Sequence, residues 1–322
     1  MIGFLPRPIL EAVDRLDLRL EVPVHIPDLE VLLSRTVLDG GKRFRPVLCF
    51  LTGSLLGVPL EKVAPYARVA EFIHAATLAH DDVIDEAATR RRKPTLNAEI
   101  GNARAVLAGD ILLARVVREI AALGNLQILD EGAKVLEDLV QGEWLQLDRR
   151  DVIQTERSRL EAAAEKKTSS LIAWCCTTPG RLSQGSPELI EHLRALGVGL
   201  GLIFQMADDI IDFEENGEKP FAQDLREGLV NFVTFELLGK HPELSGAVSA
   251  WMKTPRLESR PWTPAQLEDA KRAVRAAIQA NIETLRGELG RIIELGRVPA
   301  PDQDPAAIAL FQILEYLAER DF

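Results

Sequence analysis

Two clusters of aspartate residues share one spacing and stand far apart in the chain. The first reads Asp-Asp-Val-Ile-Asp at residues 81–85, and the second reads Asp-Asp-Ile-Ile-Asp at residues 208–212. On a helix, the first and last carboxylates of such a cluster lie one turn apart on one face, where like charges repel. A divalent cation removes that repulsion, and magnesium usually binds one or two carboxylates together with phosphate oxygens. Two facing clusters would therefore form a metal cage for a diphosphate.

One such cluster alone is more often a solvated acidic helix face, but both clusters here follow apolar stretches, which favours the metal interpretation. At about 100° per residue, His74 falls on the same helix stripe as Asp81 and Asp85. Gly201 and Gln205 fall in the same way on the stripe of residues 208 and 212. A lone histidine in an apolar helix is more often a core residue, whereas this position makes His74 a candidate ligand contact.

Two dense basic runs interrupt an acidic chain. They are Lys42-Arg43-Phe44-Arg45, which follows two glycines, and residues 90–93, which follow the first aspartate cluster. A charge run is usually a solvated face. The second run nevertheless lies where a loop should cover the predicted metal cage, and arginine binds phosphate with a rigid bidentate fork. Both runs are therefore candidate diphosphate contacts.

The overall composition excludes several other classes of function. With 49 acidic against 38 basic residues, a net charge of -11 disfavours general nucleic-acid binding. Three cysteines without a Cys-x-x-Cys spacing support neither a disulfide scaffold nor a zinc site. We find no signal peptide, and no apolar stretch that looks long enough to span a bilayer. These features predict a soluble cytoplasmic protein without a transmembrane segment.

Helical patterns dominate the sequence, and no hairpin-type strand pattern is evident. The expected helices cover residues 61–85, 101–123, 131–147, 156–176, 187–212, 265–295 and 306–320. Ser186 and Thr263 are expected N-caps, the latter in a capping box with Gln266. The proline-rich stretch 241–264 reads as a loop-rich excursion, and the glycines at 197–201 as positions of close helix packing. We therefore expect one all-α domain over residues 1–322.

Together these motifs resemble the trans-isoprenyl diphosphate synthases, also called polyprenyl synthetases. The similarity runs from about residue 39 to residue 320 and is strongest before Gly228. It is carried by the stretch Gly40–Pro46, by Glu-Phe-Ile-His at 71–74, by residues 80–85 with Arg90-Arg91, by Lys167-Thr168, and by residues 204–212. The resemblance implies an all-α fold, a single bundle of long antiparallel helices around a deep central cavity, and a homodimer. It implies head-to-tail condensation of isopentenyl diphosphate with an allylic diphosphate.

The resemblance also implies a role for each matching residue. Asp81, Asp85, Asp208 and Asp212 would bind Mg²⁺, and Asp82, Asp209 and Lys167 would complete the catalytic set. Lys42, Arg45, His74 and Arg91 would bind isopentenyl diphosphate. Arg90, Lys167, Thr168, Gln205 and Lys219 would contact the allylic substrate.

Product length and two departures from the family pattern qualify this picture. Ala76 and Thr77, where bulky side chains would close the cavity floor, are small, as is Ala70. We therefore expect a trans-polyprenyl product longer than farnesyl, unless another helix closes the floor.

Gln223 and Leu229 stand where the family usually has lysine. The absence of these two lysines leaves the reaction rate and the preferred allylic substrate open.

Several alternatives remain open at the level of sequence. One is a geranylgeranyl- or farnesyl-type short-chain synthase, and another is a weakly active partner subunit of a heteromeric synthase. A class I terpene cyclase or head-to-head condensing enzyme would not need Lys42, Arg45 and His74. A scaffold protein would not need paired carboxylate clusters.

Overall fold

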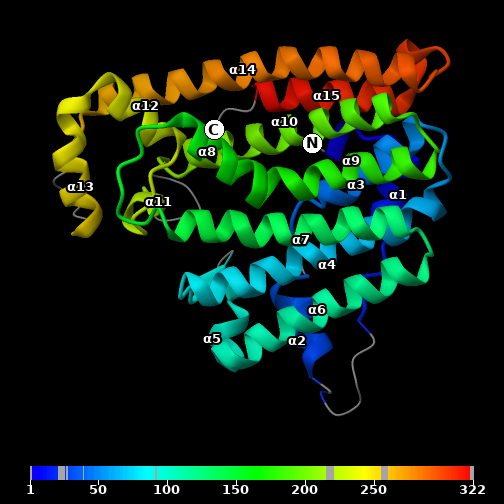
Figure 1. Ribbon diagram of the computed structural model, residues 1–322, viewed down its shortest axis with the longest axis horizontal. Helices are drawn as coiled ribbons and strands as arrows, with labels where there is room; N and C mark the ends of the chain where they lie inside the picture. Colours follow the sequence, from blue (N-terminus) through cyan, green and yellow to red (C-terminus); the bar gives the residue numbers. More distant parts are fainter. Residues whose placement is uncertain are drawn as a thin grey trace. The chain divides into compact units, whose positions relative to one another are not determined.

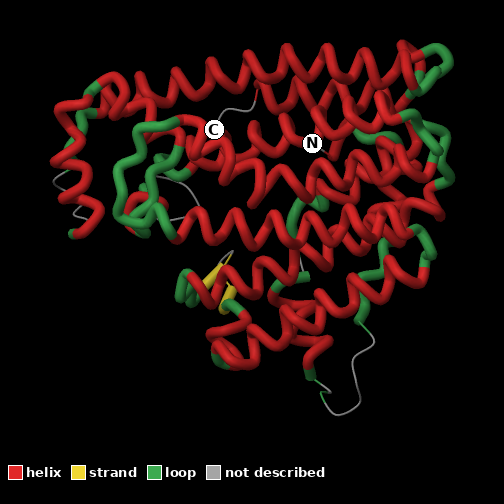
Figure 2. Tube along the Cα trace, viewed as in Figure 1, coloured by secondary structure: helices red, strands yellow, loops and turns green. Residues whose placement is uncertain are grey.

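Helices make up nearly all the regular structure in this computed structural model (Figure 2). The structure describes residues 2–20, 26, 28–38, 40–90, 93–214, 221–254 and 260–319. Within these ranges the only strands are β1 (Thr89–Arg90) and β2 (Lys93–Pro94), which pair antiparallel. The all-α fold class expected from the sequence is therefore confirmed.

The chain forms two compact units, and Figure 1 labels their α-helices in chain order. The first unit comprises Met1–Leu136, Trp174–Arg194 and Arg291–Leu310. Its own elements are η1 (Ile2–Phe4), α1 (Arg7–Asp14), α2 (Leu29–Thr36), α3 (Phe44–Leu55), α4 (Leu60–Ile84), β1, β2, α5 (Leu96–Ile100), α6 (Asn102–Ala122) and η5 (Pro301–Gln303).

The second unit comprises Glu137–Ala173, Ala195–Gly290 and Phe311–Phe322. Its own elements are α8 (Arg157–Ala164), η2 (Glu165–Ser169), α11 (Gln223–Arg226), α12 (Phe232–Lys240), η3 (Pro242–Leu244) and α13 (Ser245–Lys253). Five further helices contribute residues to both units: α7 (Leu126–Leu147), α9 (Ser170–Leu182), α10 (Pro187–Ile211), α14 (Pro264–Leu295) and α15 (Pro305–Glu319). That the chain is a single domain stays a prediction.

In the first unit, α4 packs along α6 and α3. Small residues permit these contacts. A Cβ on Gly109 of α6 would lie 2.3 Å from the His80 ring of α4, and one on Gly53 of α3 would lie 2.6 Å from Val63. Phe50 and Phe72 are completely buried, and burying such a side chain stabilises the fold by about 1.5–3 kcal/mol. The helix that carries the first aspartate cluster is thus held on two sides.

In the second unit, glycines of α10 bring its backbone close to η2 and the start of α9. A Cβ on Gly197 would lie 2.4 Å from the Cα of Ala173, and one on Gly201 would lie 2.4 Å from the Cα of Ser169. Because real side chains never approach backbone so closely, both positions require glycine. The predicted packing role of these glycines is confirmed.

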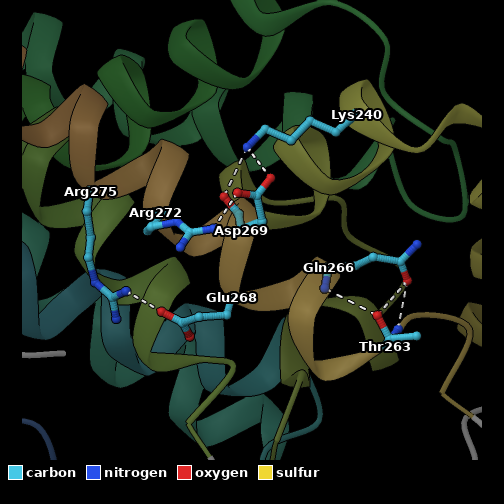
Figure 3. Close-up of polar contacts among 7 residues, drawn as sticks. All are labelled: Lys240, Thr263, Gln266, Glu268, Asp269, Arg272 and Arg275. Carbon is cyan, nitrogen blue, oxygen red and sulfur yellow. Dashed lines mark hydrogen bonds and ion pairs between the residues drawn. The ribbon is translucent and has the colours of Figure 1, made fainter.

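The seven predicted long helices are present, with one correction. The predicted helix over residues 156–176 contains a π-helical turn, η2, that the sequence analysis did not predict, and the helix continues through α9 to Leu182. The predicted N-caps are confirmed. The amide of Leu189 donates to Ser186 Oγ (3.2 Å). Thr263 and Gln266 exchange hydrogen bonds as a capping box (Figure 3).

One further expectation needs correction. Among its described residues, the stretch 241–264 is not mainly loop, because α13 lies within it and buries Trp251 and Met252. In the part of the chain that the structure describes, one helix, α10, is long and apolar enough to cross a membrane by length and composition alone, with a mean hydropathy of 1.3 over its most apolar window. Half of that window is buried inside the protein, as in the core helix of a globular fold.

Candidate active site

The first aspartate cluster forms the last turn of α4, in the first unit. Asp81 and Asp85 are half-buried, whereas Asp82 is 1% exposed. Arg90 of β1 donates to Asp82 Oδ1 from Nε (2.9 Å) and Nη2 (2.8 Å). Because a buried carboxylate needs a partner, this pair satisfies Asp82 and fixes Arg90 beside the cluster.

The hairpin after α4 holds this arginine in place. Thr95, which is 2% exposed, donates from Oγ1 to the carbonyl of Ala87 (2.6 Å). Asn97 donates to the carbonyls of Asp82 and Ala87, both at 3.1 Å. These side chains add hydrogen bonds to backbone oxygens at and just beyond the end of α4, where the helical ladder runs out. The predicted substrate contact Arg91 lies outside the described residues.

The first basic run forms the turn into α3, in the same unit. Gly40 and Gly41 have φ of 77° and 80°, a region that favours glycine. Lys42 is exposed, and Arg43 binds the carbonyl of Leu38 and the carboxylate of Glu71 on α4. The basic turn is thus tied to the helix that carries the aspartates.

Arg45 and His74 lie at the same junction of α3 and α4. Burial lowers the pKa of Arg45, and the neighbouring Glu71 carboxylate opposes that shift. Its Nε is buried and has no hydrogen-bond partner among the described residues. His74, half-buried, follows Glu71 by one turn on α4. An unsatisfied buried guanidinium nitrogen is costly, so Arg45 is suited to receiving an anionic ligand.

The second aspartate cluster ends α10, in the second unit, and its three carboxylates have different surroundings. Asp208 is exposed, whereas Asp209 and Asp212 are 2% and 3% exposed. Asp209 accepts the amide of Phe232 and the side-chain NH₂ of Gln205, both at 2.8 Å. Burial raises the pKa of Asp209, and the nearby carboxylate of Asp224 raises it further.

Asp212 is bound to the short helix α11. Its carboxylate accepts the amides of Gln223 (2.9 Å) and Asp224 (3.3 Å), and its carbonyl accepts the amide of Ala222 (2.7 Å). Carboxylates accept such amides favourably at a helix start. Both oxygens of Asp212 therefore hold backbone, which makes it a support for the cluster as well as a candidate metal ligand.

The predicted substrate residues Lys167 and Thr168 lie in the π-helical turn η2 of the second unit. Lys167 Nζ contacts Glu143 (2.5 Å) and Gln146 (3.2 Å) of α7. Thr168 Oγ1 donates to the side-chain oxygen of Gln205 (3.1 Å), which also bonds Asp209. A continuous chain of hydrogen bonds thus joins η2 to the second cluster, and π-helical turns are frequent at functional sites.

Sequence reasoning missed the residues that contact Lys167 and Asp224. Glu143 and Gln146 stand three apart on α7, which is the spacing of neighbours on one helix face. Asn231 caps α12 and donates to Asp224 Oδ2 (2.9 Å). In the sequence, helical spacing is the one signal for Glu143 and Gln146, and the N-cap preference of asparagine is the one signal for Asn231.

The predicted site residues thus form two groups, one in each unit. Lys42, Arg45, His74, Arg90 and the first cluster lie in the first unit, and Lys167, Thr168, Gln205 and the second cluster lie in the second. Lys219 lies outside the described residues. That the two clusters face each other stays a prediction.

The donor set fits a hard divalent cation. Asp81, Asp85 and Asp208 offer carboxylate oxygens that are half-buried or exposed. Among the described residues, no group of three or more His, Cys, Asp or Glu side chains is arranged to hold a metal ion by protein ligands alone. Magnesium keeps several waters and binds through one or two carboxylates plus substrate phosphates, so it does not require such a group.

Comparison with known proteins agrees with this reading. A mouse protein, all trans-polyprenyl-diphosphate synthase PDSS1, is 34% identical over 253 residues, which is 74% of this chain and 61% of that protein. The chain thus spans about three fifths of the length of this relative.

Solved structures match over nearly the whole chain. A decaprenyl diphosphate synthase from Rhodobacter capsulatus has a TM-score of 0.82 and 26% identity, over 97% of this chain and 96% of its own. A polyprenyl synthase from Caulobacter crescentus, complexed with calcium and isoprenyl diphosphate, has a TM-score of 0.75 and 26% identity, over 98% and 95%. The family model described as polyprenyl synthetase matches residues 27–259. The chain therefore belongs to the polyprenyl synthetase family.

Proposed function

We propose that this protein is a magnesium-dependent trans-prenyltransferase that condenses isopentenyl diphosphate with an allylic diphosphate, head to tail. The observation that carries the proposal is the pair of aspartate clusters. Each cluster is hydrogen-bonded to side chains that are candidates for binding phosphate. Arg90 is bound to Asp82, and a chain of hydrogen bonds from Thr168, the neighbour of Lys167, reaches Asp209 through Gln205. Family membership and the calcium complex of the Caulobacter crescentus relative support it.

In the proposed reaction, the allylic carbon–oxygen bond breaks and its electron pair leaves with the diphosphate. Arg90, Lys167 and Lys219 stabilise the developing charge on that leaving group. The double bond of isopentenyl diphosphate, held by Lys42, Arg45, His74 and Arg91, attacks the allylic cation. A new carbon–carbon bond forms, and a proton passes to the released diphosphate.

Magnesium, held by Asp81, Asp85, Asp208 and Asp212, would supply positive charge that neutralises the diphosphate oxygens. The cluster carboxylates orient the allylic diphosphate so that its leaving group meets the cationic side chains. Water must be excluded, because it would capture the cation.

The proposed product is a trans-polyprenyl diphosphate longer than farnesyl. Ala70 and Ala76 of α4 are completely buried, and Thr77 is half-buried. The relatives named above as polyprenyl and decaprenyl synthases support a long product. Product chromatography tests this. Farnesyl diphosphate as the end point would refute it, and Thr77→Phe is expected to shorten the product chain.

The proposal includes a homodimer in the cytoplasm. Val140 and Trp144, one turn apart on α7, are 66% and 67% exposed. Large apolar side chains exposed together mark an interaction surface, and closed two-fold dimers are the commonest protein oligomers.

The decisive experiment combines purified protein, labelled isopentenyl diphosphate, several allylic primers and magnesium. We expect labelled polyprenyl diphosphate only when magnesium is present, and none after chelation. Asp81→Ala and Asp208→Ala should abolish turnover while circular dichroism stays helical. Unchanged turnover in either variant would overturn the site assignment.

A further inference from the structure

A buried lysine closes the C-terminal end of α10, the helix that carries the second aspartate cluster. Lys271 of α14 is 5% exposed, and its Nζ donates to the carbonyl of Phe213 (2.9 Å) and to Glu214 Oε1 (2.8 Å). Burying an ammonium group is costly unless it is paired. Its partners here lie just beyond the last turn of α10, where carbonyls lack helical donors and a cation is favoured.

An aromatic stack lies at the same place. The ring of Phe213 packs edge-on against Phe221 at 5.7 Å between centroids, and against Trp262 at 6.0 Å. The guanidinium of Arg260 lies over the Phe221 ring, 4.1 Å from its centroid, which is close enough for a cation–π contact. Arg260 and Trp262, which precede α14, therefore hold the rings of Phe213 and Phe221 together.

The stack and the lysine border directly on the second aspartate cluster. Phe213 follows Asp212 in the chain, and Phe221 precedes Ala222, whose amide bonds the Asp212 carbonyl at 2.7 Å. The next amide, of Gln223, bonds the Asp212 carboxylate. Displacing either aromatic ring would thus move the amides that fix Asp212.

We propose that Lys271 and Arg260 are positioning residues for the diphosphate site at the second aspartate cluster. They act through Phe213 and Phe221. The proposal rests on the proposed function, because it assigns the affected ligand as the allylic diphosphate with magnesium. The residues assigned to isopentenyl diphosphate that the structure describes belong to the other unit, so its binding should not change.

The test compares Lys271→Met, which keeps the length and apolar bulk of the side chain, with Lys271→Arg, which keeps the charge. Lys240→Ala is the matched control. Lys240 of α12 pairs with the partly exposed Asp269, which lies on α14 two residues before Lys271 (Figure 3). For Lys271→Met we expect kcat/KM for the allylic substrate to fall about 10- to 100-fold, with KM for isopentenyl diphosphate unchanged. Lys271→Arg should recover part of the loss, and Lys240→Ala should match the wild type.

Arg260→Met tests the second arm of the proposal in the same assay. It removes the guanidinium from the face of Phe221 and leaves an apolar side chain of comparable length. We expect it, like Lys271→Met, to raise KM for the allylic substrate selectively. An equal rise in KM for both substrates, or an unchanged KM for the allylic substrate in both variants, would overturn the positioning role.

A second readout does not depend on turnover. Titration calorimetry with inorganic pyrophosphate and magnesium should show weaker binding to Lys271→Met than to the wild type. Amide hydrogen exchange at Ala222 and Gln223 should become faster in the variant, and Lys240→Ala should change neither. If the wild type binds pyrophosphate but does not turn over, the proposed function fails and the positioning role still stands. If exchange and binding are unchanged in Lys271→Met, the positioning role fails, whatever the activity.

Discussion

The three carboxylates of the second cluster divide into one exposed group and two buried ones. Asp208 is exposed, whereas Asp209 and Asp212 accept backbone amides in the interior. A buried carboxylate that accepts amides stabilises the local backbone, and an exposed one is accessible to a ligand. At the residue scale, identical side chains in one motif thus have different roles: two stabilise the local backbone, and one is accessible to a ligand.

This division predicts different consequences for two substitutions. Asp208→Asn should leave the free energy of unfolding within about 0.5 kcal/mol of the wild type, because it is a surface change, while turnover is lost. Asp212→Ala should destabilise the protein by about 2 kcal/mol or more, because two amides lose their acceptor. Urea unfolding and the condensation assay measure the two effects. Equal stability of both variants would contradict the assignment.

A second residue-scale prediction concerns Asp269 and its ion pairs with Lys240 and Arg272, which are drawn in Figure 3. Hydrogen bonds from Lys240 and then Arg272 lower the pKa of Asp269 to about 2. Because the folded pKa lies below the unfolded value, the pair stabilises the fold above about pH 4 and loses this effect as the pH falls towards 2. A carboxyl NMR titration should give this low pKa, and Lys240→Ala should raise it. An unshifted value in the wild type would contradict the pairing.

At the scale of elements, α10 and the turn η2 must be in contact for the hydrogen bonds from Thr168 to Gln205 and from Gln205 to Asp209 to form. Gly201 makes that contact, because a Cβ there would lie 2.4 Å from both Cα and Oγ of Ser169. Gly201→Ala should therefore destabilise the fold by about 1–3 kcal/mol and lower turnover, since the two elements must separate.

Gly287→Ala is the matched control for this prediction. Gly287 lies within α14, and among the described residues no atom outside its own stretch of helix backbone would lie within 4 Å of a Cβ there. Alanine in a helix interior is favoured over glycine by about 0.5–1 kcal/mol, so this variant should be more stable than the wild type. Thermal unfolding of both variants gives the comparison, and a stable, fully active Gly201→Ala would contradict the argument.

The long helices were predictable because their apolar periodicity runs over many turns and their starts carry cap residues. Shorter elements were not. α3 is buried along most of its length, so its sequence shows little polar alternation. α13 lies between prolines that favoured a loop. The turn η2 has no local signal, because it forms where α10 approaches through glycines that lie distant in sequence.

The helical placement of both aspartate clusters could be predicted, but the partners of their side chains could not. The spacing of the aspartates favours a helix, which the structure confirms, and a bound cation, which stays a prediction. The pairing of Arg90 with Asp82 depends on the hairpin that follows α4. The bonds of Asp212 to α11 depend on the left-handed conformation of Ala222 (φ 53°), which no sequence rule indicates.

At the scale of the whole molecule, a net charge of -11 has to coexist with the two anionic substrates of the proposed reaction. Long-range attraction cannot deliver them, because an acidic surface repels diphosphates. Binding must therefore rest on local groups, such as the basic turn before α3, Arg90 and Lys167, together with the divalent cation. This requirement explains why the proposed enzyme should depend steeply on magnesium and little on moderate salt.

The last prediction concerns assembly. Val140 and Trp144 expose apolar surface on α7 that water would otherwise cover, so a second copy of the chain should bury it. Light scattering should give twice the chain mass of 35.6 kDa for the wild type. Trp144→Glu should shift the mass towards that of one chain, because an unpaired buried charge is costly at an interface. Lys134→Glu, an exposed change on the same helix, should leave the dimer intact. A wild type with the mass of one chain, or a Trp144→Glu variant as dimeric as the control, would show that this face is not the interface.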